Sequence, residues 1–399
     1  MSQKTPIHPG IWALAVTSFA IGVAEFIVVG VLPAIAQDLH VSLAAAGKLV
    51  GLYALALAIG TPLAVLGLAR LARKTVLLSL ITLFLAGNIL SSLADSYPLL
   101  LAGRAITAVA HGSFFAIGAT VASRLAPPGQ GGRAIALMFS GLTLAMVIGV
   151  PLGSLIGNSV GWRLPFYAVA GLAVIAWVAT AIWVPRLAVL PEAGKTVTQL
   201  AALLRPEILA MMAITVTGFG ASFAAFTFIT PILTDISGFS SQTASLLLII
   251  FGIATLIGNQ LGGKLTVTQG WTSALRRMLL LLAVTLILLA VALPWRLPVM
   301  VLLFLWGLLA FGMSPAFQAG MLSTAERWTP KAVDFASALN IAAFNLGITL
   351  GETLGSAVVA KGLMAMTPLA GVLLVTIAQL PLFWLSSRFT RDARRAHRA

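Results

Sequence analysis

The chain has 399 residues, of which 60% are hydrophobic and only 9% are charged, and its mean hydropathy is +1.05. About a quarter of the residues of an ordinary soluble domain are charged, so this composition excludes a soluble globular protein. The absence of cysteine excludes disulfide frameworks and thiolate metal sites, and four scattered histidines do not predict a metal site.

Hydrophobic segments long enough to cross a bilayer follow one another along the whole chain. A helix that crosses about 30 Å of hydrocarbon needs about 20 apolar residues. Short polar turns separate the segments, and turns this short make neighbouring helices antiparallel. The pattern predicts twelve membrane-spanning helices, at 11–33, 46–69, 74–94, 98–123, 133–156, 164–185, 207–234, 242–265, 275–293, 298–323, 335–359 and 365–387.

The sizeable polar gap between the sixth and seventh spans predicts two six-helix bundles. We expect an N-terminal bundle at 1–185, a cytoplasmic linker at 186–206, and at 207–399 a C-terminal bundle with a basic cytoplasmic tail. Three pairs of residues recur at one separation of 198 residues: Pro33 with Pro231, Ser42 with Ser240, and Gly60 with Gly258. The expected fold class is therefore an all-α membrane protein whose two bundles are pseudo-symmetric, an arrangement that transporters use.

The net charge of +14 is unevenly distributed along the predicted topology. With a cytoplasmic N-terminus, 19 of the 24 Lys and Arg residues fall in inner loops and tails, and four fall in outer loops. This positive-inside bias predicts a multi-pass membrane protein with both termini in the cytoplasm. The bias also argues against nucleic-acid binding. We expect the basic tail from Arg388 to Arg398 to contact anionic lipid headgroups.

The fifth expected span combines several glycines with one proline: Gly141, Gly149, Pro151 and Gly153. Glycines let membrane helices approach each other closely. Pro151 removes a backbone hydrogen bond and creates a bend point. From these residues alone, the pattern could equally be a packing kink with no bearing on transport.

This pattern resembles the antiporter motif of the major facilitator superfamily, in particular of its twelve-span drug:proton antiporters and their sugar-efflux (arabinose-efflux-permease-like) group. Arg104 in the fourth span and Ala24-Glu25-Phe26 in the first span add to the resemblance. The resemblance implies a monomeric secondary active transporter of the bacterial inner membrane that moves a small molecule by alternating access. It also implies coupling to the proton gradient, with no cofactor and no metal.

The loop after the second span, 69–74, resembles the superfamily's cytoplasmic gate motif in degraded form. Arg70, Arg73 and Lys74 keep its basic residues, whereas Ala69 and Ala72 replace the acid and the glycine. The three cations are either parts of a gate or charges that only set the topology.

Ionisable residues inside a span cost a few kcal/mol, so each one calls for a reason. Glu25 could take up and release protons or attract a cationic substrate; alternatively it is a structural partner for Arg104. Thr107 and His111 share a helix face with Arg104, at spacings of three and seven residues. His111 is either a proton relay or a neutral hydrogen-bonding residue.

Glu352 is the second acid well inside a span, on one face with Asn345, Thr349 and Ser356. We expect this polar stripe to point into the bundle. Its role stays open between substrate binding, a second proton site, and a position near the outer surface beside Lys361. The candidates for proton coupling and for substrate binding are then Glu25, Arg104, His111, Glu352, Asn345, Tyr53, Gln318 and Phe226.

Two other functions compete with export of a small molecule. A proton-coupled importer of a metabolite would have the same fold. An enzyme or sensor is disfavoured because the sequence shows no nucleophile–base pair, and the lack of a Gly-x-x-x-x-Gly-Lys-Ser/Thr loop excludes an ATP-driven pump.

Overall fold

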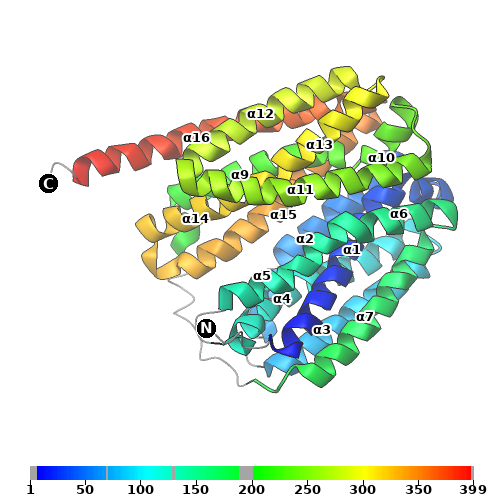
Figure 1. The fold of residues 1–399 in the computed structure, drawn as a ribbon, viewed down its shortest axis with the longest axis horizontal. Coiled ribbons are helices and arrows are strands. Elements are labelled where there is room, and N and C mark those ends of the chain that lie inside the picture. Colours follow the sequence, from blue (N-terminus) through cyan, green and yellow to red (C-terminus); the bar gives the residue numbers. More distant parts are fainter. Residues whose placement is uncertain (1–6, 69–70, 128–130, 188–200, 397–399) are drawn as a thin grey trace, which may run out of the picture. The chain divides into compact units, whose positions relative to one another are not determined.

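The computed structural model describes residues 7–68, 71–127, 131–187 and 201–396, and within them it contains helices and no strands (Figure 1). Twelve helical segments of this described part are long and apolar enough to cross a membrane. This confirms the expected all-α fold and its twelve spans. Arg70 and the central part of the expected linker, 188–200, lie outside the described residues.

The helices form two compact units. The first consists of 1–191 together with 240–249, and the second of 192–239 together with 250–399. Residues 240–249 therefore group with the first unit, although they precede the rest of the eighth span in the sequence.

The first unit contains the helices of the first six spans: α1 (Pro9–Asp38), α2 (Leu43–Leu68), α3 (Arg73–Ser92), α4 (Tyr97–Leu125), α5 (Gly131–Leu144), the π-helical turn η1 (Ala145–Gly149), α6 (Val150–Ser159) and α7 (Arg163–Trp183). α1 contacts α2, α4, α5, α6 and α7. Because it has neighbours all round, its buried residues occupy every face, as expected for a central helix.

The second unit holds the remaining spans and several short turns: η2 (Ala201–Leu204), α9 (Pro206–Phe226), α10 (Ile229–Pro231), η3 (Ile232–Ile236), α11 (Ser241–Gln269, whose first residues belong to the first unit), α12 (Trp271–Ala292), α13 (Arg296–Gly312), α14 (Ser314–Trp328), η4 (Pro330–Ala332), α15 (Val333–Ala360), η5 (Met364–Met366) and α16 (Thr367–Ala396). α9 packs on both α15 and α16.

Three expected spans are interrupted, each next to a proline. The fifth span contains η1 just before Pro151, the seventh breaks after Phe226 and before Pro231, and the tenth breaks at Met313 before Pro315. A proline has no N–H to bond the carbonyl four residues earlier, so the chain must adjust there. The continuity of α1 through Pro33 shows that a proline permits such a break without requiring it.

The glycines of the fifth span face α1. A Cβ atom built on Gly141 would lie 2.8 Å from the backbone nitrogen of Phe19 and would also collide with the carbonyl oxygen of Ala15. Similar atoms on Gly149 and Gly153 would collide with Val23 and Ile27 of α1. The residues of the motif therefore let α5 and α6 lie directly against α1.

We expect Gly141→Ala to lower the thermal stability of the purified protein, by about 1–3 kcal/mol, because the added methyl group meets backbone atoms of α1 that cannot rotate away. Gly171→Ala in α7 is the matched control, since nothing lies within 4 Å of its Cβ position. Thermal unfolding in detergent measures both variants. Equal stability of the two would contradict the close packing of α5 on α1.

Candidate functional site

The buried ionisable residues of the first unit gather around one face of α4. Arg104, Thr107 and His111 are 1%, 1% and 6% exposed. Their spacing along α4 places them on the same side of the helix. Tyr53 of α2 and Glu25 of α1 complete the group. The structure thus brings together four residues that the sequence analysis selected separately: Glu25, Tyr53, Arg104 and His111.

Arg104 is held through its two terminal guanidinium nitrogens and one face of the guanidinium plane. Its terminal nitrogens donate to the carbonyl oxygens of Ala24 and Glu25, the latter at 3.2 Å. The guanidinium carbon lies 3.9 Å from the ring centre of Tyr53, a cation–π contact. These bonds tie α4 to the backbone of α1 and to a side chain of α2, so Arg104 is a fixed positive charge.

Glu25 keeps its carboxylate available. Its side chain is half-buried, and among the described residues none donates a hydrogen bond to the carboxylate oxygens. Arg104 and Tyr53 lie close enough to act on it electrostatically. Arg104 therefore anchors α1 through main-chain carbonyls, and the acid beside it remains open to a proton or a ligand.

Tyr53 has two partners within the first unit. Besides its ring contact with Arg104, its hydroxyl lies 2.9 Å from Nδ1 of His111. His111 also packs on Phe115, with ring centres 5.1 Å apart. The imidazole is therefore a hydrogen-bonded, buried residue in this structure. Its bond to Tyr53 also provides a connection between His111 and the residues around Arg104.

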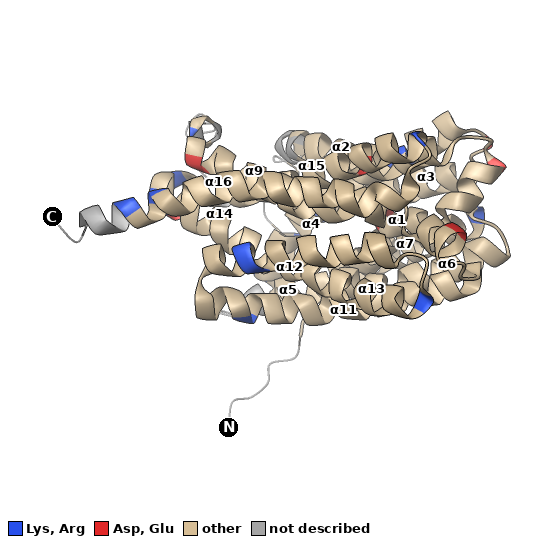
Figure 2. Cartoon of the chain, turned by 90° about the horizontal axis from the view of Figure 1, so that it is seen from above, with Lys and Arg blue, Asp and Glu red and all other residues tan. Residues whose placement is uncertain are grey.

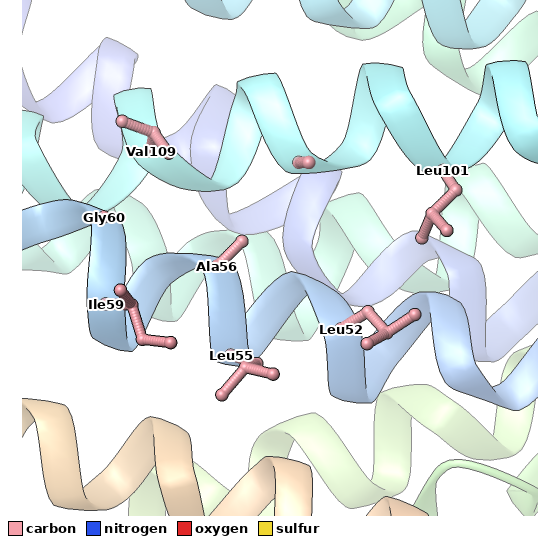
Figure 3. Close-up of a pocket in the computed structure, with 8 residues that line it drawn as sticks. Leu52, Leu55, Ala56, Ile59, Gly60, Leu101 and Val109 are labelled. Carbon is pink, nitrogen blue, oxygen red and sulfur yellow. The ribbon is translucent and has the colours of Figure 1, made fainter.

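An apolar hollow of about 430 Å³ lies along α2 and α4 (Figure 3). Gly60 lets the two helices approach, because a Cβ at this position would lie 2.6 Å from Val109. No titratable side chain lines the hollow, so it can accommodate only apolar groups. Its lining residues are Leu52, Leu55, Ala56, Ile59, Gly60, Leu101, Ala105 and Val109.

Most of the polar stripe of α15 is buried. Asn345, Glu352 and Ser356 are 8%, 2% and 4% exposed. The hydroxyl of Ser356 donates to the carboxylate of Glu352, and the amide of Asn345 donates to the carbonyl of Ile341 at 3.0 Å. Glu352 is thus an inward-facing acid with a hydrogen-bond partner one helical turn away.

Gln318 is part of a chain of buried and half-buried hydrogen bonds in the second unit. Thr215 donates to Asn340 at 2.8 Å, Asn340 donates to Gln318 at 2.8 Å, and Gln318 donates to Ser337 at 2.6 Å. Both ends of the Gln318 amide are therefore occupied by neighbours. This network connects α9, α14 and α15, and Gln318 contributes to their packing.

Phe226 lies in an aromatic cluster of the second unit. Its ring stacks on Phe251 with centres 4.7 Å apart and meets Trp306 edge-on at 6.1 Å. All three side chains are buried. Contact between Phe226 and a substrate would require these rings to separate.

Lys74, from the loop that resembles the gate motif, forms a hydrogen bond within the first unit. Its ammonium group donates to the carbonyl oxygen of Ala181 at 2.6 Å. Ala181 belongs to the last turn of α7, where carbonyls lack helical partners and attract cations. Lys74 therefore links the start of α3 to the end of α7. The neighbouring cation of the motif, Arg73, is the first residue of α3.

Comparisons with known proteins agree with this architecture. The Major Facilitator Superfamily model matches residues 14–327. The chain is 39% identical over 390 residues to the MFS-type transporter YtbD of Bacillus subtilis, covering 97% of this chain and 98% of YtbD. It is 36% identical over 374 residues to the inner membrane transport protein YdhP of Escherichia coli K12, covering 93% and 94%.

The fold also matches a solved structure. A bacterial homologue of the human lysosomal transporter Spinster, in an inward-facing and unoccupied conformation, superposes with a TM-score of 0.74 at 18% identity. The match covers 96% of this chain and 97% of that one. At 18% identity, this similarity is evidence for a shared fold alone.

We expect Arg104→Lys to lower thermal stability by about 1–3 kcal/mol, although the charge is kept. Lysine cannot reach both carbonyls of α1 while it stacks on Tyr53, and hydrogen bonds of charged groups each contribute about 1.5–3 kcal/mol. Arg277→Lys is the control, because Arg277 is exposed and bonds only the Gln269 side chain among the described residues. A melting temperature of Arg104→Lys equal to that of the control would contradict the anchoring role.

Proposed function

We infer the function from the premise that the chain belongs to the major facilitator superfamily and is a multi-pass secondary transporter, not an enzyme. Within that class we propose a proton-coupled antiporter that exports a small molecule by alternating access. It acts as a monomer in a bacterial inner membrane, with both termini in the cytoplasm. The similarity to YdhP, an inner membrane transport protein, supports the location.

The pair of Glu25 and Arg104 is the observation that best supports proton coupling. An acid inside a span needs a reason to be there. Arg104 is held by the carbonyls of Ala24 and Glu25 and by the ring of Tyr53, so its charge cannot follow a substrate. The Glu25 carboxylate, without a hydrogen bond from the described residues, can exchange a proton for a ligand beside that fixed charge.

In the proposed transport cycle, a proton and the substrate compete for the carboxylate of Glu25. A proton from the outside neutralises Glu25 and weakens its hold on the substrate, which leaves outward. When the site opens inward, the proton leaves and a new substrate binds. Glu352 and Asn345 of the second unit are the proposed further ligands or second proton site, because both are buried polar residues of α15.

Two features support the substrate class and the direction. The apolar hollow along α2 and α4 would suit the apolar part of an amphipathic drug, and suits a sugar-like solute less. The resemblance of the glycine–proline pattern around Pro151 to the antiporter motif supports export. The alternative, import of a metabolite, predicts solute movement in the opposite direction in the transport assay described next.

We expect Glu25→Gln to abolish transport driven by an imposed pH gradient, because the amide cannot carry a proton. Substrate exchange at equal pH should continue but need a higher substrate concentration, because the neutral amide resembles the protonated acid and binds substrate more weakly. The assay uses proteoliposomes and a panel of sugars and amphipathic drugs, and the direction of solute movement is recorded. Glu326→Gln, an exposed acid at the end of α14, is the control. Full gradient-driven transport by Glu25→Gln would contradict proton coupling through Glu25.

Replacement of Tyr53 separates its two contacts. Tyr53→Phe keeps the ring beneath Arg104 and loses the bond to His111, whereas Tyr53→Leu loses both. We expect Tyr53→Leu to lower the initial transport rate at least tenfold, since a cation–π contact in a desolvated site contributes up to about 2 kcal/mol. Tyr53→Phe should retain most of the rate. Equal losses would instead assign the main role to the hydroxyl and His111.

A further inference from the structure

The last helix carries an aromatic and basic surface at its C-terminal end. α16 runs from Thr367 to Ala396, beyond the apolar part of the last span. On this end Phe383 is 68% exposed and Trp384 is 37% exposed, and Arg388 and Arg391 follow on an exposed stretch. Figure 2 shows basic residues along the same end of α16. Proton coupling and substrate binding leave these residues without a role.

These four side chains and that of Ser387 line a hollow of about 160 Å³, which we call the α16 groove: Phe383, Trp384, Ser387, Arg388 and Arg391. Spacings of three, four and seven residues place Trp384, Ser387, Arg388 and Arg391 along one helix face. The guanidinium carbon of Arg388 lies 5.1 Å from the ring centre of Trp384, so the indole helps to hold this cation over the groove.

The two arginines of the α16 groove are free to bind an anion. Among the residues whose side chains are described, no carboxylate pairs with Arg388 or Arg391. The segment 388–398 contains five arginines and one acid, Asp392. The local charge is therefore strongly positive.

Neighbouring helices extend the same surface chemistry within the second unit. Arg276 of α12 donates to Ser386 of α16 at 3.5 Å. Arg327 of α14 lies over Phe389 at 5.3 Å, and Trp328 meets Phe389 edge-on at 4.7 Å. Arginine and aromatic rings thus recur on three helices around the end of α16, which is the combination found at the boundary between hydrocarbon and water.

We propose that the α16 groove binds the headgroup phosphate of an anionic phospholipid such as phosphatidylglycerol, with Phe383 and Trp384 against the glycerol and upper acyl chains. Arginine presents a planar fork of donors that matches phosphate oxygens. An anionic leaflet attracts basic residues next to a span, at about 1 kcal/mol for each. A free phosphate ion would leave the two large exposed rings unused, whereas a lipid uses the cations and the rings together.

The test is native mass spectrometry of the full-length protein in detergent, titrated with phosphatidylglycerol, phosphatidylcholine or inorganic phosphate. We expect the double variant Arg388→Gln/Arg391→Gln to weaken binding of the first phosphatidylglycerol about thirtyfold, the factor for two basic residues. Phosphatidylcholine should bind weakly to every variant. Arg277→Gln, an exposed arginine in the first turns of α12, is the matched control and should stay within twofold of wild type.

Two further measurements make the test decisive. Trp384→Leu should weaken phosphatidylglycerol binding less than the double variant, because it removes a ring but keeps both charges. Melting temperatures show whether each variant is folded. The proposal is overturned if the double variant binds phosphatidylglycerol as wild type does, if Arg277→Gln loses as much, or if inorganic phosphate competes at equal concentration.

Discussion

The hydrogen bonds from Arg104 to the backbone carbonyls of Ala24 and Glu25 are the interaction on which the first unit depends most. A guanidinium in a membrane span needs acceptors, and the apolar surroundings make each bond to it strong. These acceptors are main-chain atoms of the central helix α1, so the acid beside them is not consumed by the pairing. One buried cation thereby joins α1, α2 and α4 and leaves Glu25 available for chemistry.

Small residues bring other helices of the first unit close to α1. Three glycines, Gly141, Gly149 and Gly153, bring α5 and α6 against the side of α1. The π-helical turn at Ala145–Gly149 lies just before Pro151, which cannot donate a backbone hydrogen bond. In the second unit α9 and α15 approach in the same way through Gly220 and Gly347. Both units thus use small residues at close helix contacts, because membrane helices associate by close packing more than by hydrophobic burial.

The charged residues divide into groups with different physical tasks. Arg104 and Glu25 act inside the membrane, where each charge is costly. Lys74 satisfies the carbonyl of Ala181 at the end of α7. Arg388 and Arg391 stand beside exposed rings at the end of α16. The chain therefore uses its cations both as buried or half-buried donors that join helices and as exposed groups beside aromatic side chains.

The amino-acid sequence by itself determined the twelve spans and the face shared by Arg104, Thr107 and His111, because hydropathy and helical spacing are local properties. It also predicted that Asn345 and Glu352 point inward. Only the tertiary structure decided their partners. Arg104 bonds carbonyl groups, which every residue carries and no sequence pattern marks. Tyr53 and Gln318, expected to bind substrate, have partners 58 and 22 residues away, at His111 and Asn340. Such contacts depend on how distant helices pack, and the same side chains in another packing would have been free.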